Sequence, residues 1–346
     1  MRSMKSHIST IAKAAKEWLQ PDNLILKKAI EKTVDEGLFS FEDIKFQIRT
    51  LKQNIESGQI EEWANRAGLS ETKNSFGSKV LCLHAGNLPL VGFQDALGTI
   101  LSGADYFGKL SRKDPYLLQS FLRKLDEFPL ENNIQYSTDF NLFAGIKADK
   151  VLFAGVESSI DAVKEIAIAQ NSVAEDVEWV MRSAKFSMAY IPDESTQVME
   201  DLVEAVFRYG GRGCRSVAVV VSPIRFGRLK CHFQDYVESF WLKNPQLNKP
   251  KEILAHQFAY NKAIEREQAW MNDFLIQETE EFPELDFTLH WVEGNEDKVR
   301  ELANKYGSAL QTVYTTDGII EGVSNDFLSK AQTPDLWWKP DGMDVI

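Results

Sequence analysis

The chain has 346 residues, which is enough for about two domains. It is 44% hydrophobic and 26% charged, an ordinary globular composition that excludes a collagen-like or broadly disordered protein. Its 51 acidic and 39 basic residues give a formal net charge of −12, and no basic cluster offsets this excess, so we expect no nucleic-acid binding.

No apolar run reaches the roughly 18–20 residues that cross a bilayer, so we expect no membrane span. The N-terminal segment has the pattern of an amphipathic helix and lacks the apolar stretch of a signal peptide. Three cysteines, Cys82, Cys214 and Cys231, are too few for a disulfide scaffold. These features predict a cytoplasmic protein.

The chain up to about residue 70 is predicted to be helical, with Ser40 opening a segment whose apolar residues recur at helical spacing. From Ser78 onward, short apolar strands alternate with helices. The predicted strands are 79–83, 106–110, 134–137, 151–154, 186–191, 217–221, 287–292 and 309–315. The predicted helices are 93–101, one opened by Asp114-Pro115, 159–169, 194–209 and 296–306. This alternation indicates βαβ units, a largely parallel sheet and two closely packed α/β lobes.

The segment Gly210-Gly211-Arg212-Gly213-Cys214-Arg215-Ser216 leads from a helix into an apolar strand. Glycines let the backbone approach a ligand closely, and the two flanking arginines favour the nucleophilic thiolate. Cys214 is therefore a candidate nucleophile. A buried structural cysteine after a helix stop is an equally good interpretation of these residues taken alone.

Three other segments follow predicted strands and precede helices. His84-Ala85-Gly86-Asn87-Leu88-Pro89 is either a simple turn or a site where the Asn87 amide stabilises an oxyanion. Lys109-Leu110-Ser111-Arg112-Lys113 is either a solvated charged turn or a grip on nucleotide ribose and phosphate. The third segment, Phe153 to Ser159, has a glycine at the strand end, which by itself says little.

The histidines show no metal-ligand spacing, so we expect no metal site. The chain also lacks the Gly-x-Ser-x-Gly elbow and the phosphate-binding Gly-x-x-x-x-Gly-Lys-Ser/Thr loop. Serine hydrolase and P-loop nucleotidase functions are therefore not indicated.

Taken in order, a strand followed by Gly-Asn-x-Pro, then Lys-x-Ser, Phe-x-Gly and Gly-x-Gly-Cys, resembles the aldehyde dehydrogenase superfamily. Within it, the chain most resembles the acyl-CoA reductases of the LuxC type, from about Ser78 to the C-terminus. The blocks that carry the likeness are VLCLHAGNLPLVGFQDALGTILSGADYFGKLSRKDPYLL, YGGRGCRS and QTPDLWWKPDGMD.

The resemblance implies a role for each matching residue. Cys214 would accept the acyl group, while the Asn87 amide and the Cys214 N–H would stabilise the oxyanion. The expected cofactor-binding residues are Lys109, Ser111, Arg112, Gly155, Ser158 and Ser159, with Lys109 on the ribose and the last three beside the pyrophosphate.

Three departures from the superfamily pattern refine this expectation. Arg112 stands where a glutamate usually binds the ribose hydroxyls, which favours the 2′-phosphate of NADP(H). Met181 stands where aldehyde-oxidising relatives have their general base, so an acyl-enzyme would resist hydrolysis. Ile160 replaces the second glycine of the phosphate loop, and the usual Glu-x-Phe clamp is missing.

The resemblance thus implies an aldehyde-dehydrogenase-like α/β fold: a helical N-terminal region with a Rossmann-like cofactor-binding domain over 1–185, a catalytic domain over 186–325, and a returning segment over 326–346. The expected reaction is the NADPH-dependent reduction of an acyl-CoA to the aldehyde, with CoA as leaving group. Reduction of an acyl phosphate or a carrier-protein thioester, and a non-catalytic nucleotide-binding subunit, are the alternatives. A homodimer or an acyl-transferase or synthetase partner is also expected from the superfamily.

Overall fold

The computed structural model describes residues 3–316 and 318–338. These residues form two compact units. Unit 1 contains the described chain up to Ala184 together with residues 335–338, and unit 2 contains the described chain from Lys185 to Pro334. We describe each unit separately.

Unit 1 begins with four helices, as the sequence predicts for this region: α1 (Met4–Trp18), α2 (Leu24–Asp35), α3 (Phe41–Glu56) and α4 (Gln59–Arg66). Ser3, Asn23 and Ser40 cap the first three, each accepting a hydrogen bond from a backbone N–H of the first turn. The helices bury an apolar face that includes Trp18, whose indole N–H donates to Ser120 Oγ at 2.9 Å.

The described part of unit 1 holds a five-stranded parallel sheet in the order β3-β2-β1-β4-β5. Its strands are β1 (Lys79–Leu83), β2 (Asp105–Lys109), β3 (Ile134–Ser137), β4 (Ala148–Gly155) and β5 (Val173–Ser183). Its helical connections are α5 (Phe93–Leu101), α6 (Leu117–Leu125), η1 (Phe140–Phe143), η2 (Glu157–Ser159) and α7 (Ile160–Ala169).

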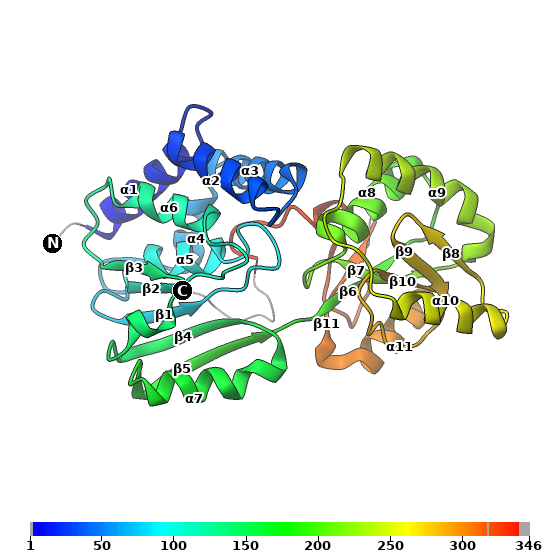
Figure 1. Cartoon of the computed structure of the whole chain (residues 1–346). Coiled ribbons are helices and arrows are strands. Elements are labelled where there is room, and N and C mark those ends of the chain that lie inside the picture. The colour runs from blue at the N-terminus through cyan, green and yellow to red at the C-terminus, as the bar shows by residue number, and fades with distance from the viewer. Residues whose placement is uncertain (1–2, 317, 339–346) are drawn as a thin grey trace. The chain divides into compact units, whose positions relative to one another are not determined.

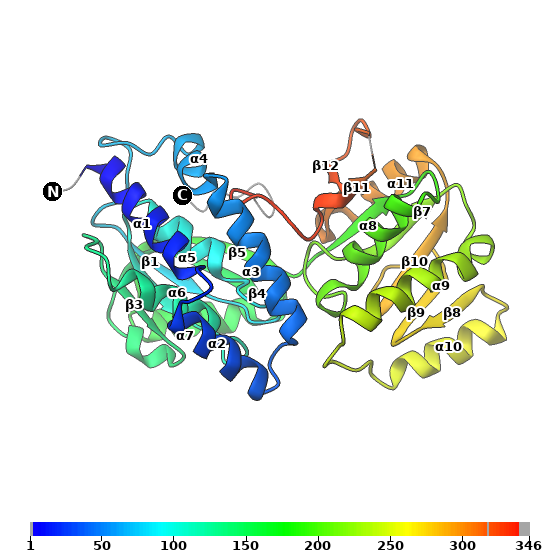
Figure 2. The same cartoon turned by 90° about the horizontal axis from the view of Figure 1, so that it is seen from above.

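The two faces of this sheet have separate cores. Helices α5 and α6 pack with the N-terminal helices on one face, and α7 covers the other, as Figures 1 and 2 show. Along β1, Val80 and Cys82 belong to the first core, while Leu81 and Leu83 belong to the second, because successive side chains of a strand point to opposite faces. A largely parallel α/β sheet is therefore confirmed.

The described part of unit 2 holds a seven-stranded sheet in the order β12-β11-β6-β7-β10-β9-β8. Its strands are β6 (Phe186–Tyr190), β7 (Val217–Ser222), β8 (Gln268–Met271), β9 (Phe274–Glu278), β10 (Thr288–Glu293), β11 (Leu310–Thr315) and β12 (Asn325–Phe327). Its helices are α8 (Thr196–Phe207), η3 (Arg208–Gly210), α9 (Phe226–Lys243), α10 (Ile253–Ala263), α11 (Glu296–Tyr306), η4 (Gly307–Ala309) and η5 (Leu328–Lys330). Only the β8–β9 pair, among the described strands, is antiparallel.

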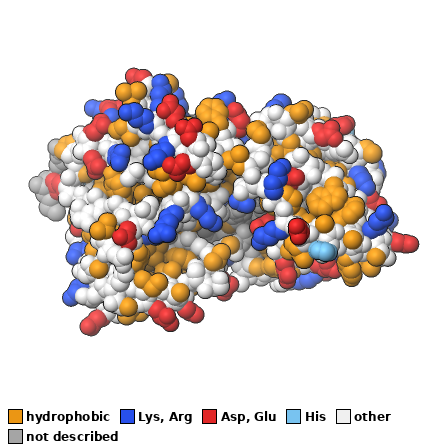
Figure 3. All heavy atoms as spheres, in the orientation of Figure 1, with side chains coloured by type: hydrophobic (Ala, Val, Ile, Leu, Met, Phe, Trp, Pro, Cys, Tyr) orange, Lys and Arg blue, Asp and Glu red, His pale blue; other side chains and the backbone are white. Residues whose placement is uncertain are grey.

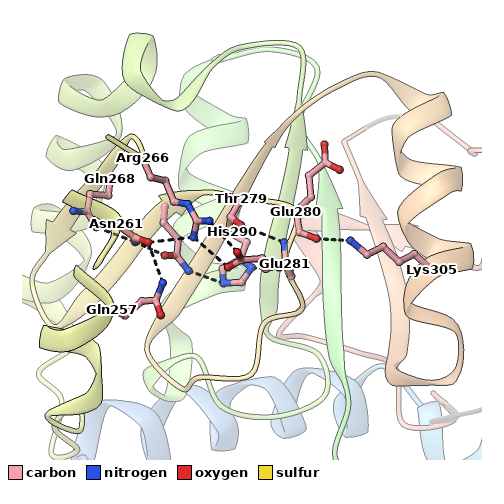
Figure 4. Close-up of polar contacts among 10 residues, drawn as sticks. Gln257, Asn261, Arg266, Gln268, Thr279, Glu280, Glu281, His290 and Lys305 are labelled. Carbon is pink, nitrogen blue, oxygen red and sulfur yellow. Dashed lines mark hydrogen bonds and ion pairs between the residues drawn. The ribbon is translucent and has the colours of Figure 1, made fainter. Parts of the chain in front are cut away.

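A network of side-chain amides joins α10 to β8, β9 and β10 (Figure 4), and Asn261 Nδ2 makes the contact to β8 by donating to Gln268 Oε1 at 3.0 Å. Asn261 Nδ2 donates to Gln277 Oε1 at 2.5 Å, and Gln277 Nε2 lies 2.9 Å from His290 Nε2. His290 Nδ1 lies 3.0 Å from the Glu281 carbonyl oxygen. Arg266 donates both to Asn261 Oδ1 and to the Glu281 carboxylate. The network thus terminates at the Glu281 backbone carbonyl and at the ion pair between Arg266 and Glu281.

Candidate active site

The polar segments predicted in unit 1 meet at one edge of its sheet. Strand β1 lies between β2 and β4 and runs parallel to both, so the segments that follow these strands leave from the same carboxyl edge. The chain turns to opposite sides of β1 at this point, which is where open α/β sheets bind ligands. Asn87, Lys109, Ser111, Arg112, Gly155, Ser158 and Ser159 all lie in or beside these segments. Cys214 lies in unit 2.

The segment 84–92, between β1 and α5, presents Asn87. Asn87 is exposed, but His84 at the start of the segment is buried. His84 Nε2 lies 2.7 Å from the Tyr106 hydroxyl oxygen, and the His84 N–H donates to the Lys109 carbonyl. Burial lowers the pKa of His84 to about 4, so its ring is neutral at pH 7. The segment that carries the exposed Asn87 is therefore anchored at its first residue, His84.

Two cations stand at the end of β2. Lys109 is half-buried and Arg112 is exposed. Burial lowers the pKa of Lys109, and the Arg112 charge lowers it further, so the two side chains share one electrostatic environment. Ser111 Oγ accepts a hydrogen bond from the Lys113 N–H at 3.2 Å. Two cations beside a hydroxyl can bind the ribose and phosphate groups of a nucleotide, so these residues fit a nicotinamide cofactor.

The segment after β4 suits an anion less well. Ser159 Oγ donates to the Val156 carbonyl at 2.7 Å, and Ser158 is exposed. Glu157 and Asp161 stand in the first turns of η2 and α7, where carboxylates complement the helix dipole and repel a phosphate. The pyrophosphate contact expected of Gly155, Ser158 and Ser159 therefore stays a prediction.

In unit 2, a strained loop presents Cys214 between α8 and β7. Tyr209, Gly210, Gly211 and Gly213 all have positive φ, at 58°, 69°, 69° and 104°. A Cβ on Gly211 would come within 2.8 Å of the Phe274 ring, so only glycine fits there. Glycine adopts such φ values without strain, whereas Tyr209, which has a Cβ, keeps its left-handed φ only because the surrounding structure enforces it.

The anchors of this loop are buried polar side chains. Ser187 Oγ on β6 donates to the Cys214 carbonyl oxygen at 2.8 Å, and Ser216 Oγ donates to the Arg212 carbonyl at 2.7 Å. Before the loop, Arg208 donates to both carboxylate oxygens of Glu204 and, at 2.7 Å, to Asn244 Oδ1. Cys214 itself is only half-buried. The loop therefore fixes the backbone of a cysteine that solvent can reach.

Tyr314 on β11 lies in the electrostatic environment of Cys214. Burial raises the pKa of the Tyr314 phenol, Arg215 opposes that shift, and Cys214 adds to it. The phenol is therefore neutral at pH 7 and cannot act as an anionic base beside the thiol.

The sequence reasoning missed Ser187, Arg208 and Tyr314. No motif marks them, because Ser187 and Arg208 bind Cys214 and Asn244, which are distant in the sequence, and Tyr314 is related to Cys214 only through its electrostatic effect. Met181, at the place of the missing general base, lies on β5 and packs against the α7-side core. Its neighbour Arg182 forms a buried ion pair with Asp95 on α5. The run of positive φ values in this half-buried, glycine-rich loop is the structural signal that the sequence could only suggest.

On the face seen in Figure 3, Lys and Arg side chains are interspersed with Asp and Glu side chains. Of the helices in the described chain, none combines the length and apolar character needed to cross a membrane.

Solved structures show the fold class. The NADP-dependent glyceraldehyde-3-phosphate dehydrogenase of Bacillus halodurans C-125 matches with a TM-score of 0.63 and 13% identity, covering 92% of this chain and 75% of its own. Aldehyde dehydrogenase 21 of Physcomitrella patens matches with a TM-score of 0.62 and 14% identity, covering 98% and 79%. The aldehyde-dehydrogenase-like fold is therefore confirmed.

A sequence search of the curated proteins found no significant match. A family model described as acyl-CoA reductase (LuxC) matches residues 3–302, including the segments of Asn87, Lys109 and Cys214. The match covers most of the chain, N-terminal helices included. The chain therefore belongs to the LuxC acyl-CoA reductase family and is an oxidoreductase of that type.

Proposed function

We propose that this enzyme reduces an acyl-CoA thioester to the aldehyde, with NADPH as reductant and a thioester on Cys214 as intermediate. The observation that carries the proposal is the loop of Cys214. Three consecutive left-handed residues, Tyr209 to Gly211, and buried anchors lead to a half-buried thiol, whereas an ordinary helix end needs only one left-handed residue.

In the first step, the Cys214 thiolate attacks the carbonyl carbon of the acyl-CoA, and the carbonyl π electrons move onto oxygen. The family resemblance assigns two hydrogen-bond donors to this oxyanion, the Asn87 side-chain amide and the Cys214 backbone N–H. When the carbonyl re-forms, the bond between carbon and the CoA sulfur breaks. CoA leaves as a thiolate and the acyl group stays on Cys214.

Lys109, Ser111 and Arg112 would hold the adenosine half of the cofactor. NADPH, when bound, supplies the hydride that brings the acyl group to the aldehyde level. Arg112 would recognise the 2′-phosphate, because a guanidinium pairs with a phosphate through two parallel hydrogen bonds. The dehydrogenase of B. halodurans was solved with NADP, which is in keeping with this choice.

Met181 explains why the intermediate survives. A thioether cannot take a proton from water, and Met181, on β5, is partly buried against the core. Without a general base at this position, hydrolysis of the acyl-enzyme is slow. The acyl group then leaves as aldehyde after reduction or returns to CoA.

The test is a reductase assay with purified enzyme, a panel of acyl-CoAs and NADPH, in which cofactor oxidation and CoA release are followed together. Cys214→Ala should abolish both signals. Asn87→Ala should lower the turnover rate by about 10²–10³, the usual effect of losing one oxyanion donor. Cys231→Ala is the matched control, since Cys231 is exposed on α9, and it should retain activity.

Activity in Cys214→Ala would contradict the proposed mechanism. Turnover with an acyl phosphate or a carrier-protein thioester, and none with any acyl-CoA, would show that the acyl donor is not acyl-CoA. The role of Cys214 as nucleophile would then still stand. An acyl-transferase or synthetase partner fits the same reaction and is tested by whether turnover needs a second protein. A homodimer is tested by the molecular mass of the purified enzyme in solution.

A further inference from the structure

The segment that presents Asn87 contains a backbone conformation that its own sequence does not favour. Leu90 has φ of 58°, a left-handed value that is unfavourable for a residue with a Cβ. Its side chain is 2% exposed and belongs to the core beneath α5. Leu90 therefore cannot relax outward, and some interaction must hold its backbone.

That interaction comes from Asp114. Asp114 Oδ2 accepts a hydrogen bond from the Leu90 N–H at 2.8 Å, and Asp114 Oδ1 accepts from the Leu117 N–H at 3.3 Å. The sequence predicts Asp114 as the cap of a helix beginning at Pro115. The helix begins two residues later, at Leu117, and one carboxylate oxygen is thereby left for the Asn87 segment.

A second contact joins the same two segments. A Cβ on Gly86 would lie 2.3 Å from Ser111 Oγ, so the backbone beside Asn87 packs directly against Ser111 in residues 109–113, the proposed cofactor segment. The Asp114 N–H in turn donates to the Ser111 carbonyl at 3.2 Å. Asn87 therefore lies between two points, Gly86 and Leu90, that are both held by residues 111–114.

We propose that Asp114 is a positioning residue that holds the Asn87 amide in place through the Leu90 N–H, and so links the cofactor segment to the oxyanion donor. This inference rests on the proposed function of Asn87. Asp114 is 4% exposed, and burial raises its pKa to about 6 against the opposing effect of its two N–H donors. A buried carboxylate kept at this electrostatic cost is suited to binding backbone donors.

The test is a double-mutant cycle of Asp114→Asn with Asn87→Ala. Asparagine keeps the size of the side chain but places an NH2 group against one of the two backbone donors. We expect Asp114→Asn to lower kcat about tenfold, with little change in the KM for NADPH. In the Asn87→Ala background the same substitution should change kcat less than twofold, because the group it positions is gone. An equal loss in both backgrounds would overturn the proposal.

Amide hydrogen exchange measures the hydrogen bond between the Leu90 N–H and Asp114 independently of catalysis. In Asp114→Asn the peptide containing Leu90 should exchange at least tenfold faster than in the wild type, while a β1 peptide should be unchanged. The matched control is Asp139→Asn, which alters an exposed aspartate that caps η1. Unchanged exchange at Leu90 would overturn the proposal.

The two measurements separate the inference from the reaction assignment. If the wild type has no reductase activity but the Leu90 amide exchanges faster in Asp114→Asn, the proposed function is wrong and the contact between Asp114 and Leu90 stands. If the wild type is active and Asp114→Asn has the same kcat and the same Leu90 exchange rate, the positioning role of Asp114 is wrong and the proposed function stands.

Discussion

At the residue scale, the candidate site uses buried polar groups to hold backbone. Ser187 holds the carbonyl of Cys214, and Asp114 holds the N–H of Leu90. A buried hydrogen bond of this kind contributes modestly when made, but a buried group left without its partner costs about 1–3 kcal/mol. Such residues therefore fix a loop firmly without touching a substrate.

At this scale, a substitution of Arg112 tests the preference of the enzyme for NADPH over NADH. Arg112→Gln should lower kcat/KM for NADPH about 10–100-fold and leave that for NADH nearly unchanged, because a charge-assisted hydrogen bond to the 2′-phosphate is lost. The measurement is steady-state kinetics with both cofactors. Lys113→Gln, the removal of an adjacent exposed cation, is the charge-matched control. Comparable wild-type efficiency with NADPH and NADH would contradict this role.

The sequence could suggest Asn87, Lys109 and Cys214 because each stands in a local pattern. It could not suggest Ser187 or the hydrogen bond from Arg208 to Asn244, because the partners in these two contacts come from other elements. Asp114 is the intermediate case. A helix cap is visible in the sequence, but the second hydrogen bond, to Leu90, spans 24 residues.

At the element scale, the predictions succeed where an element is bounded by clear signals. The strands at 79–83 and 134–137 and the helices at 93–101 and 296–306 are confirmed residue by residue. Strand β5 was missed because three exposed acids, Glu175, Asp176 and Glu178, interrupt its apolar residues and because it lies at the sheet edge. The β8–β9 hairpin and helices α9 and α10 were also not predicted.

The helix α10 shows why periodicity failed there. Its exposed residues include Ile253, Tyr260 and the adjacent Ile264, while a polar residue, Asn261, is fully buried. An inverted pattern of this kind gives no amphipathic signal. The buried amide contacts of Asn261 in Figure 4 provide the physical reason, since they satisfy a polar group inside the unit.

The same network predicts acid sensitivity. Burial lowers the pKa of His290 from 6.5 to about 4, so the folded state binds its proton more weakly than the unfolded state. Its stabilising contribution is present above pH 6.5 and is lost as the pH falls from 6.5 toward 4, by about 3 kcal/mol in total. Protonation would also set an N–H against the Gln277 amide nitrogen.

We therefore expect His290→Gln to reduce the loss of unfolding free energy between pH 7 and pH 4.5 by about 2–3 kcal/mol, measured by urea denaturation. His232→Gln, which changes an exposed histidine on α9, is the control and should follow the wild type. An unchanged pH dependence in His290→Gln would show that this network does not contribute to acid unfolding.

At the scale of the whole molecule, the chain enters unit 2 after Ala184 and returns to unit 1 at Asp335. Leu336 is buried in the core of unit 1, and its N–H donates to Gln59 Oε1 at 2.8 Å. Gln94 on α5 donates to the carbonyls of Leu336 and Trp338. The returning segment is therefore held by the helix that follows the Asn87 segment. The resemblance puts its start at 326, whereas 326–334 lie in unit 2.

The central claim is that Cys214 takes the acyl group from a thioester, and one measurement tests it directly. The enzyme is mixed with acyl-CoA in the absence of NADPH, and the intact protein mass and the released CoA are determined. We predict one acyl group on Cys214, about one equivalent of CoA per enzyme, and loss of the adduct when NADPH is added. An adduct that persists in Cys214→Ala, or its absence with every acyl donor that supports turnover, would contradict the account.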